Sequence, residues 1–204
     1  MIMSKSKILY VLLAVPSLLG AAAPAICTLG SNSSSYNDFT DQRPSVDAAE
    51  LTQQVSAALG PVCAPACATS LTVMRNSTAP NVLLTSTGRE AKLVYQPQFF
   101  TSVYETYGDA GILALIAHEM GHVIDQAAPQ PWIRNDWSPE LRADAWGGCA
   151  LAKLNLRPRA LGAGLRALAA FPSPAHPAWT LRSPILRVGY TQCGGDGARF
   201  DQLK

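Results

Sequence analysis

Histidine is scarce in this chain: only three of the 204 residues are histidines. Charged residues are also few, at 15%, and no run of lysines and arginines marks a nucleic-acid-binding stripe. After the first 25 residues no apolar stretch approaches the roughly 20 residues that a membrane-spanning helix needs. The low charge and the 48% content of hydrophobic residues argue against disorder. The chain is long enough to form one domain with its own core.

Residues 1–25 have the pattern of a secretory signal peptide. Lys5 and Lys7 give a positive start, Ile8–Leu19 is apolar apart from a Pro-Ser pair, and Ala23-Pro24-Ala25 supplies the small residues of a cleavage site. We therefore predict cleavage near Ala25 and a secreted or periplasmic protein. Two alternatives stay open, an uncleaved membrane anchor and a lipoprotein modified at Cys27.

Cleavage would also change the net charge. The precursor carries 16 basic and 14 acidic residues, and the signal segment holds two of the lysines and no acid. The mature chain then has a formal charge of zero. On that sum the sequence predicts neither a nucleic-acid partner nor attraction to a membrane surface.

The five cysteines all lie beyond the predicted cleavage site. Export permits disulfides, and an odd number leaves at least one thiol outside any internal pair. Cys63 and Cys67 are close in sequence within a proline-containing turn, and Cys149 could bridge to Cys193 between later elements. Cys27 would then remain, although spacing alone does not fix the connectivity.

The mature chain is predicted to begin with a flexible lead-in over residues 26–45, followed by one domain over 46–204. Asp47–Leu59 is expected to be a helix, with Asp47 as N-cap, Glu50 in the capping-box position and Gly60-Pro61 as its end. Short strands and then helices follow. The predicted strands are Thr69–Arg75, Asn81–Thr85 and Ala91–Tyr95, and the predicted helices are about Pro97–Tyr107, Gly111–Gln126, Pro139–Leu154, Ala160–Phe171 and Ser183–Tyr190. This order predicts an α+β fold that is mostly helical with a small N-terminal sheet.

One short motif carries most of the chemical information. His118-Glu119-Met120-Gly121-His122 has the spacing H-E-x-x-H, which three histidines and five glutamates would produce by chance about once in a thousand such chains. Residues i and i+4 share one helix face, so both imidazoles can bind one Zn²⁺. Glu119, about 100° further around the helix, would lie beside the metal and accept a proton from a zinc-activated water.

The helix that carries this motif is apolar around nearly its whole circumference, so we expect it to be buried. Asp125 lies on the histidine face as well. Two histidines and two acids in a buried helix are costly unless they are paired or bind a metal. The alternative is a structural, hydrogen-bonded histidine pair.

A zinc hydrolase needs a third protein ligand, and Glu140 is the best candidate. It follows Ser138-Pro139, a helix start, and Asp144 lies on the same face one turn later. Glu140 would bind the metal while Asp144 orients a ligand histidine. The alternative is that an acid in the first helical turn only complements the helix dipole, and spacing alone does not decide between the two.

His-Glu-Met-Gly-His followed by Glu-x-x-Ala-Asp resembles the gluzincin metallopeptidases, in particular the family of the CaaX prenyl endopeptidases and their soluble periplasmic relatives. The resemblance runs from about Leu93 to Cys193. It implies a small zincin-like domain in which Glu140 is the third zinc ligand and Asp144 supports a ligand histidine. Two departures are the short spacing of 17 residues between His122 and Glu140 and the lack of the family's transmembrane helices.

Two late residues gain a role only from this resemblance. His176-Pro177 with the downstream Arg182 resembles the family's segment that closes over the site. The resemblance implies that His176 and Arg182 stabilise the oxyanion of the transition state. Without it, His176 would be an ordinary residue of a surface loop.

Tyr95 is a candidate substrate-binding residue. The strand that it ends could lie at the edge of the sheet and pair with an extended peptide. The alternative is an ordinary half-buried strand.

Together these features predict an exported zinc-dependent metalloendopeptidase that acts on a peptide or protein substrate. His118, His122 and Glu140 would hold Zn²⁺, with Glu119 as the base. Two alternatives remain: a non-catalytic zinc-binding module for envelope assembly or interaction, and a zinc hydrolase that cleaves another bond, because the motif does not name the bond.

Overall fold

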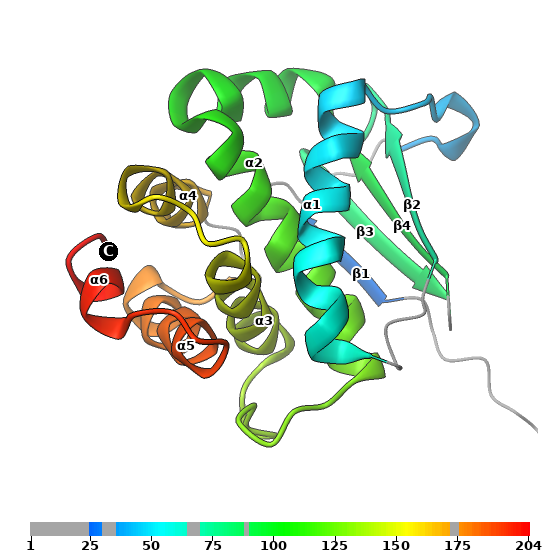
Figure 1. The fold of residues 1–204 in the computed structure, drawn as a ribbon. Coiled ribbons are helices and arrows are strands. Elements are labelled where there is room, and N and C mark those ends of the chain that lie inside the picture. The colour runs from blue at the N-terminus through cyan, green and yellow to red at the C-terminus, as the bar shows by residue number, and fades with distance from the viewer. Residues whose placement is uncertain (1–24, 30–35, 65–69, 88–89, 172–175) are drawn as a thin grey trace, which may run out of the picture.

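The structure is a computed structural model, and it describes residues 25–29, 36–64, 70–87, 90–171 and 176–204. Figure 1 shows its arrangement: a sheet on one side, the helices α1 and α2 against one face of that sheet, and the remaining helices beyond α2. Helix α3 packs mainly on α2 and α5, and α4 packs on α2. The predicted α+β class, mostly helical with a small sheet, is confirmed.

The sheet has four strands in the order β1-β3-β4-β2 among the described residues. They are β1 (Ala25–Leu29), β2 (Ser70–Arg75), β3 (Val82–Thr87) and β4 (Glu90–Tyr95). Strands β3 and β4 form an antiparallel hairpin, β2 runs parallel to β4, and β1 is antiparallel to β3. The three predicted strands are confirmed to within a few residues.

Strand β1 corrects the expectation of a flexible lead-in over residues 26–45. Its backbone pairs with β3 from Ala25 opposite Ser86 to Leu29 opposite Val82. A short 3₁₀ helix, Asp38–Thr40, follows. The sequence missed β1 because its few residues have no alternation of polar and apolar side chains. The predicted signal peptide falls on residues 1–25, which apart from Ala25 lie outside the described part of the chain.

Helix α1 (Val46–Cys63) is longer than predicted at both ends. Its N-cap is Ser45, whose hydroxyl accepts a hydrogen bond from the backbone N–H of Ala48, and not Asp47. Gly60-Pro61 does not end the helix, because a proline in the last turn removes only one backbone hydrogen bond. The buried face of α1 consists of Ala48, Leu51, Val55, Leu59 and Cys63, at the helical spacing of three to four residues.

Helix α2 (Pro97–Ala127) is two helices joined at Gly108, as the sequence predicted. Gly108 has φ 66° and ψ −165°, a conformation that glycine adopts without steric cost. The first half is partly exposed. In the second half every residue from Ala110 to His122 is buried, because the sheet side and the α3–α4 side enclose it.

The last four helices are α3 (Pro139–Lys153), α4 (Pro158–Ala170), α5 (Trp179–Gln192) and α6 (Gly197–Asp201). The first three were predicted, although α5 begins four residues earlier than expected. Pro184 lies within this helix, although a proline is commoner in the first turn. Helix α6 was not predicted. None of the helices within the described ranges is both long and apolar enough to cross a membrane.

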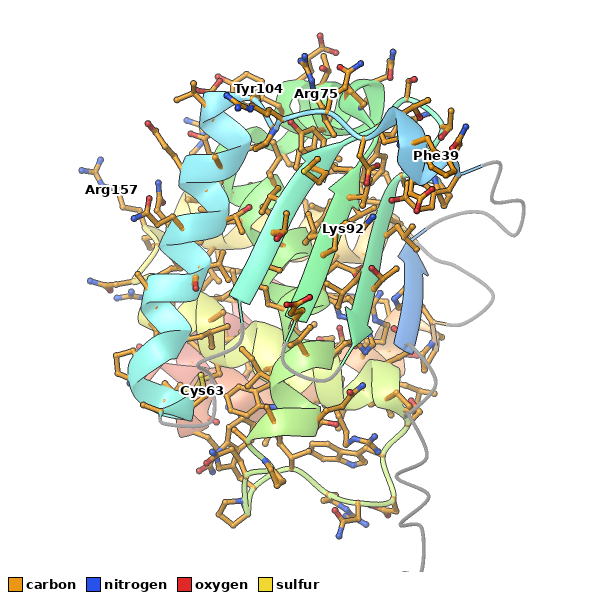
Figure 2. The ribbon with its side chains drawn as sticks, turned by 90° about the vertical axis from the view of Figure 1, so that its right-hand side faces the viewer. Phe39, Cys63, Arg75, Lys92, Tyr104 and Arg157 are labelled. Atoms are coloured by element: carbon orange, nitrogen blue, oxygen red, sulfur yellow. A yellow bond between two sulfur atoms is a disulfide. The ribbon has the colours of Figure 1, made fainter. Side chains whose placement is uncertain are left out.

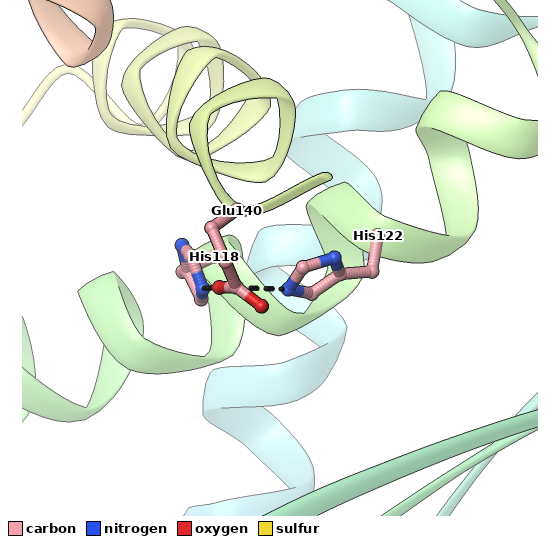
Figure 3. A group of neighbouring side chains, drawn as sticks. All are labelled: His118, His122 and Glu140. Carbon is pink, nitrogen blue, oxygen red and sulfur yellow. Dashed lines mark hydrogen bonds and ion pairs between the residues drawn. The ribbon is translucent and has the colours of Figure 1, made fainter. Parts of the chain in front are cut away.

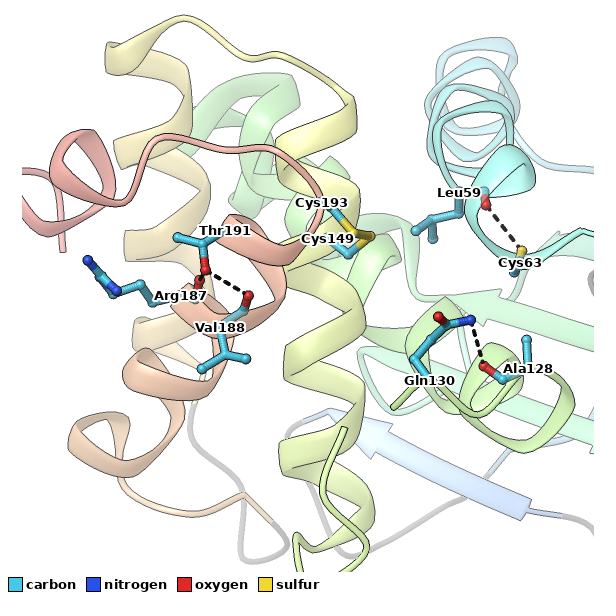
Figure 4. Close-up of a disulfide and its surroundings, with 9 residues drawn as sticks. All are labelled: Leu59, Cys63, Ala128, Gln130, Cys149, Arg187, Val188, Thr191 and Cys193. Atoms are coloured by element: carbon cyan, nitrogen blue, oxygen red, sulfur yellow. Dashed lines mark hydrogen bonds between the residues drawn. A yellow bond between two sulfur atoms is a disulfide. The ribbon is translucent and has the colours of Figure 1, made fainter. Parts of the chain in front are cut away.

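A disulfide joins Cys149 of α3 to Cys193 at the end of α5, which confirms that predicted pair (Figure 4). Gly189 of α5 is required at the same contact, because an added Cβ would collide with the backbone carbonyl of Ala145. Cys63 is also disulfide-bonded, and Cys67, its predicted partner, lies outside the described residues.

Candidate metal centre

The second half of α2 places the H-E-x-x-H motif inside the molecule. His118 and Glu119 are fully buried and His122 is 9% exposed. The rings of His118 and His122 lie nearly perpendicular, with centroids 5.0 Å apart. This is the one-turn separation that the spacing predicted. The expected burial of the helix is confirmed.

Gly121 of the motif permits the close approach of α3. A Cβ at this position would lie 2.6 Å from the carbonyl oxygen of Ala143 and 3.0 Å from Cβ of Trp146. Helix α3 begins with Ser138, whose hydroxyl accepts a hydrogen bond from the N–H of Leu141. The contact at Gly121 therefore brings the first turn of α3, with Glu140, onto the histidine pair.

Glu140 meets both histidines of the motif (Figure 3). Its Oε2 lies 3.2 Å from Nε2 of His118 and 3.5 Å from Nε2 of His122. Possible ligand atoms of these three residues all lie within 4.8 Å of one another, so the group could hold a metal ion. In a tetrahedral site with bonds of 2.0–2.1 Å, donor atoms are separated by about 3.4 Å, which is close to both distances.

A buried nitrogen supports the same interpretation. Nε2 of His122 has no hydrogen-bond partner among the described residues. Such a group is costly in the interior unless something binds it. A metal ion held by His118, His122 and Glu140 would remove that cost.

Asp144 fixes the orientation and tautomer of His118. Its Oδ1 lies 2.9 Å from Nδ1 of His118. Burial alone would raise the pKa of Asp144, but hydrogen bonds from His118 and Arg182 hold that pKa below its ordinary value. An ionised carboxylate only accepts hydrogen bonds, so Nδ1 carries the proton and Nε2 faces Glu140. This is the supporting geometry that metal-binding histidines usually have.

Arg182 binds Asp144 behind the histidine pair, whereas the resemblance implied a role at the oxyanion. Its Nε donates to Oδ2 of Asp144 and its Nη2 to Oδ1, both at 2.8 Å, and its Nη1 donates to the carbonyl of Leu168. The residue is 2% exposed. In this position Arg182 holds Asp144, which in turn holds His118.

His176 reaches the same cluster from the segment before α5. Its Nε2 lies 2.8 Å from Oε2 of Glu140 and 3.2 Å from Nε2 of His118. Its side chain is buried, so the alternative of a surface-loop histidine is wrong. Three imidazole nitrogens thus surround one carboxylate oxygen, and all three histidines of the chain meet at one place.

The cluster shifts the protonation of its members. Burial alone lowers the pKa of His118, but the carboxylates of Asp144 and Glu140 raise it to about 9. Burial alone raises the pKa of Glu140, and its three histidine contacts lower it well below its usual range. Burial raises the pKa of Glu119. Shifts of this kind concentrate at functional sites.

Arg142 is a residue near the site that sequence reasoning missed. Its Nε donates to Oδ2 of Asp125 at 2.6 Å and its Nη1 to the carbonyl of Trp137 at 2.7 Å. Asp125 is three residues after His122, and Arg142 is two residues after Glu140. The pair therefore ties the end of α2 to the start of α3. Asp125 and Arg142 have opposite charges and each lies close to a motif in the sequence, and this could have predicted their ion pair.

Tyr95 does not lie where the sequence placed it. Strand β4 lies between β3 and β2, so it has no free edge for a peptide, and the prediction that Tyr95 ends an edge strand is wrong. The ring stacks on Phe100 with centroids 4.2 Å apart, and its hydroxyl accepts a hydrogen bond from the N–H of Ser45. Alternating apolar residues look the same in an edge strand and an interior strand, which is why the sequence did not separate them.

No protein-family model, no curated protein and no solved structure matches this chain.

Proposed function

We propose that this protein is a zinc-dependent metallopeptidase. One observation carries the proposal: His118, His122 and Glu140 converge in the interior, with Glu119 on the same buried helix. The donor set suits zinc, which accepts imidazole nitrogen together with one carboxylate oxygen, whereas magnesium and calcium prefer oxygen ligands alone. With three protein ligands, the fourth position of a tetrahedral zinc ion would be left for water or substrate.

The roles of the residues follow from their positions. A bound zinc ion would act as a Lewis acid that activates water and polarises a substrate carbonyl. Asp144 keeps the proton of His118 on Nδ1 and so directs Nε2 to the metal. Arg182 holds Asp144 in place. Glu119 would accept a proton from the attacking water and pass it to the leaving amine. Burial raises the pKa of Glu119 above its ordinary value, which is the direction expected of a carboxyl that must both accept and donate a proton.

His176 is proposed to donate a hydrogen bond to the oxyanion that forms on the substrate. Its Nε2 lies 3.2 Å from His118 Nε2, so it would adjoin a metal ion held by His118. The segment just before it, residues 172–175, lies outside the described part of the chain.

The decisive experiment is Glu119→Gln. This variant should keep stoichiometric zinc and lose casein cleavage by a factor of about 100 to 10,000, because one proton-transfer group is lost. Glu105→Gln, an exposed glutamate on the first half of the same helix, is the matched control and should retain full activity. Full hydrolysis by Glu119→Gln would exclude the proposed role of Glu119.

A non-catalytic zinc module is the second candidate, and the position of His176 favours it. If His176 served as a fourth donor beside His118 and Glu140, the site would be closed as structural zinc sites are. The discriminating measurement is zinc content together with cleavage of casein and of a peptide library by the wild type. Stoichiometric zinc without chelator-sensitive cleavage of any peptide would favour the module.

A further inference from the structure

The neutral total charge of the predicted mature chain hides a strong asymmetry along the sequence. Residues 26–144 contain 12 acidic and 6 basic residues, whereas residues 145–204 contain 2 acidic and 8 basic residues. Between Asp144 and Asp196 there is no acidic residue at all. The net charge of the whole mature chain, from which we predicted no attraction to a membrane surface, is the sum of two segments with net charges of opposite sign.

Folding gathers the basic half on one side of the molecule. Helices α4, α5 and α6 form the outer layer beyond α2 and α3, on the side away from the sheet (Figure 1). The exposed acids Asp47 and Glu50 lie on α1, and Glu105 and Asp109 lie around the middle of α2. The charge asymmetry of the sequence is therefore also an asymmetry in space.

Four cations at the end of α3 and on α4 form what we call the basic face: Lys153, Arg157, Arg159 and Arg166. All four are exposed, and none forms an ion pair or a side-chain hydrogen bond with a described residue. In contrast, Arg182 is buried on Asp144 and Arg187 pairs with Asp201. The charge of the basic face is therefore left to the solvent, as is that of the exposed Arg199 on α6.

The four residues lie on a continuous surface. Lys153 ends α3, Arg157 is the N-cap of α4, and Arg159 and Arg166 are seven residues apart on α4, which places them on one helix face. A guanidinium nitrogen of Arg166 lies next to Gly162, which also faces Leu203, so the C-terminal Lys204 adjoins the same surface. In Figure 2 the side chain of Arg157 extends away from the body of the protein.

The composition of this surface indicates its partner. Among the described residues the exposed large hydrophobic ones are Phe39, Val46, Tyr104 and Leu181, and none lies between residues 153 and 170. A protein interface usually has aromatic or large apolar residues at its centre. Guanidinium groups among small residues instead suit phosphate groups, to which arginine donates paired hydrogen bonds.

We propose that the basic face docks the protein on an anionic phospholipid bilayer. The attraction does not require the face to be flat or apolar, because each lysine or arginine near an anionic membrane contributes through its charge, with about a five-fold effect on partitioning. The acidic residues on α1 and α2 would orient the molecule with that side away from the lipid. This proposal is independent of the proposed peptidase activity.

The test is co-sedimentation of the exported, full-length mature protein with two kinds of vesicle, phosphatidylcholine alone and phosphatidylcholine with one third phosphatidylglycerol. We expect binding only to the anionic vesicles at low ionic strength, with loss of binding as salt shortens the range of the attraction. Equal binding to both kinds of vesicle, or no binding to either, would overturn the proposal. Binding of a single-stranded oligonucleotide or of polyglutamate without vesicle binding would overturn it in favour of another partner.

Two double variants test whether binding to anionic vesicles depends on the basic face. Arg157→Gln/Arg159→Gln should reduce partitioning onto anionic vesicles about 25-fold. Arg43→Gln/Arg75→Gln, which removes two exposed cations from the other side of the molecule, should leave it unchanged. Equal losses in both variants would contradict docking through the basic face. Circular dichroism and zinc content show that both variants fold. Glu119→Gln should bind vesicles like the wild type, so failure of the lipid proposal and failure of the peptidase proposal give different results.

Discussion

Two polar networks of this protein differ in how many of their polar groups find a hydrogen-bond partner within the network. One is the buried metal centre between α2 and α3. The other, which we call the outer network, consists of Tyr36, Asp41, Asn76 and Lys92. Figure 2 shows Lys92 on the open face of the sheet. Both combine charged and neutral side chains from distant parts of the chain, yet only one indicates a ligand.

The outer network pairs its groups with one another. Lys92 donates to Oδ2 of Asp41 at 2.9 Å and to the hydroxyl of Tyr36 at 2.8 Å. Asn76 donates to Oδ1 of Asp41 at 2.7 Å. The side chain of Lys92 is 32% exposed, so water reaches it as well. This network docks residues 36–41 on the sheet and has no need of a further partner.

The metal centre is less complete, although it is better buried. Nε2 of His122 has no hydrogen-bond partner among the described residues, and His118, Glu140 and His176 direct their polar atoms to the same point. Burial makes an unsatisfied or unbalanced polar group costly, and this group of residues could hold a metal ion.

Removing a ligand should have the largest effect. Glu140→Ala should weaken zinc binding on the order of 1,000-fold, beyond the 10–100-fold change typical of residues that only support a ligand. Competition with a chromogenic chelator measures it. Glu90→Ala, at an exposed end of β4, is the control. Unchanged zinc affinity in Glu140→Ala would move the third ligand to Asp144 or His176.

Proton binding in the metal-free protein should have the next largest effect. The folded state raises the pKa of His118 from 6.5 to about 9. The resulting stability is fully present below pH 6.5 and is lost as pH rises through 9, on the order of 3 kcal/mol in total. Urea unfolding of the chelator-treated protein between pH 6 and 10 measures this. Zinc affinity should change in the opposite direction, because metal binding displaces the proton. A metal-free stability that rises across this range would contradict the assignment.

Removing the carboxylate that orients His118 should have the third largest effect. Asp144→Asn should weaken zinc binding about 10–100-fold, because an amide does not fix the proton on Nδ1. It should also flatten the pH dependence of the metal-free protein. Asp201→Asn removes a carboxylate that also pairs with an arginine, but at an exposed site, and should leave zinc binding unchanged. If both variants bind zinc like the wild type, Asp144 has no role in orienting His118.

The outer network should respond least. Lys92→Met should lower the free energy of unfolding by no more than about 1 kcal/mol, because partly exposed ion pairs contribute little. Its zinc content and its casein cleavage should equal those of the wild type. Lys153→Met, which removes an exposed lysine without an ion pair, should be close to neutral in unfolding. Loss of zinc from Lys92→Met would show that the two networks are coupled.

Several features could be read from the sequence because they depend on neighbours along the chain. The i and i+4 spacing of His118 and His122 determines that they share a helix face. Strand-forming residues bounded by turn signals predicted β2, β3 and β4. The pairing of α3 with α5 by Cys149 and Cys193 was also anticipated. Other features depend on residues far apart. The position of β4 inside the sheet, and with it the failure of the prediction for Tyr95, follows from the long-range pairing of β2.

From the sequence alone we predicted a buried helix with two histidines and an acid at metal-binding spacing, and a formal charge of zero for the mature chain. Packing between helices brings Glu140 and His176 within hydrogen-bonding distance of His118, and the close contact of α3 at Gly121 sets the position of Glu140. It also placed Arg182 on Asp144 and collected unpaired cations on the outer helices. Local spacing fixes which side chains share one helix face, whereas only packing between elements decides what lies opposite that face.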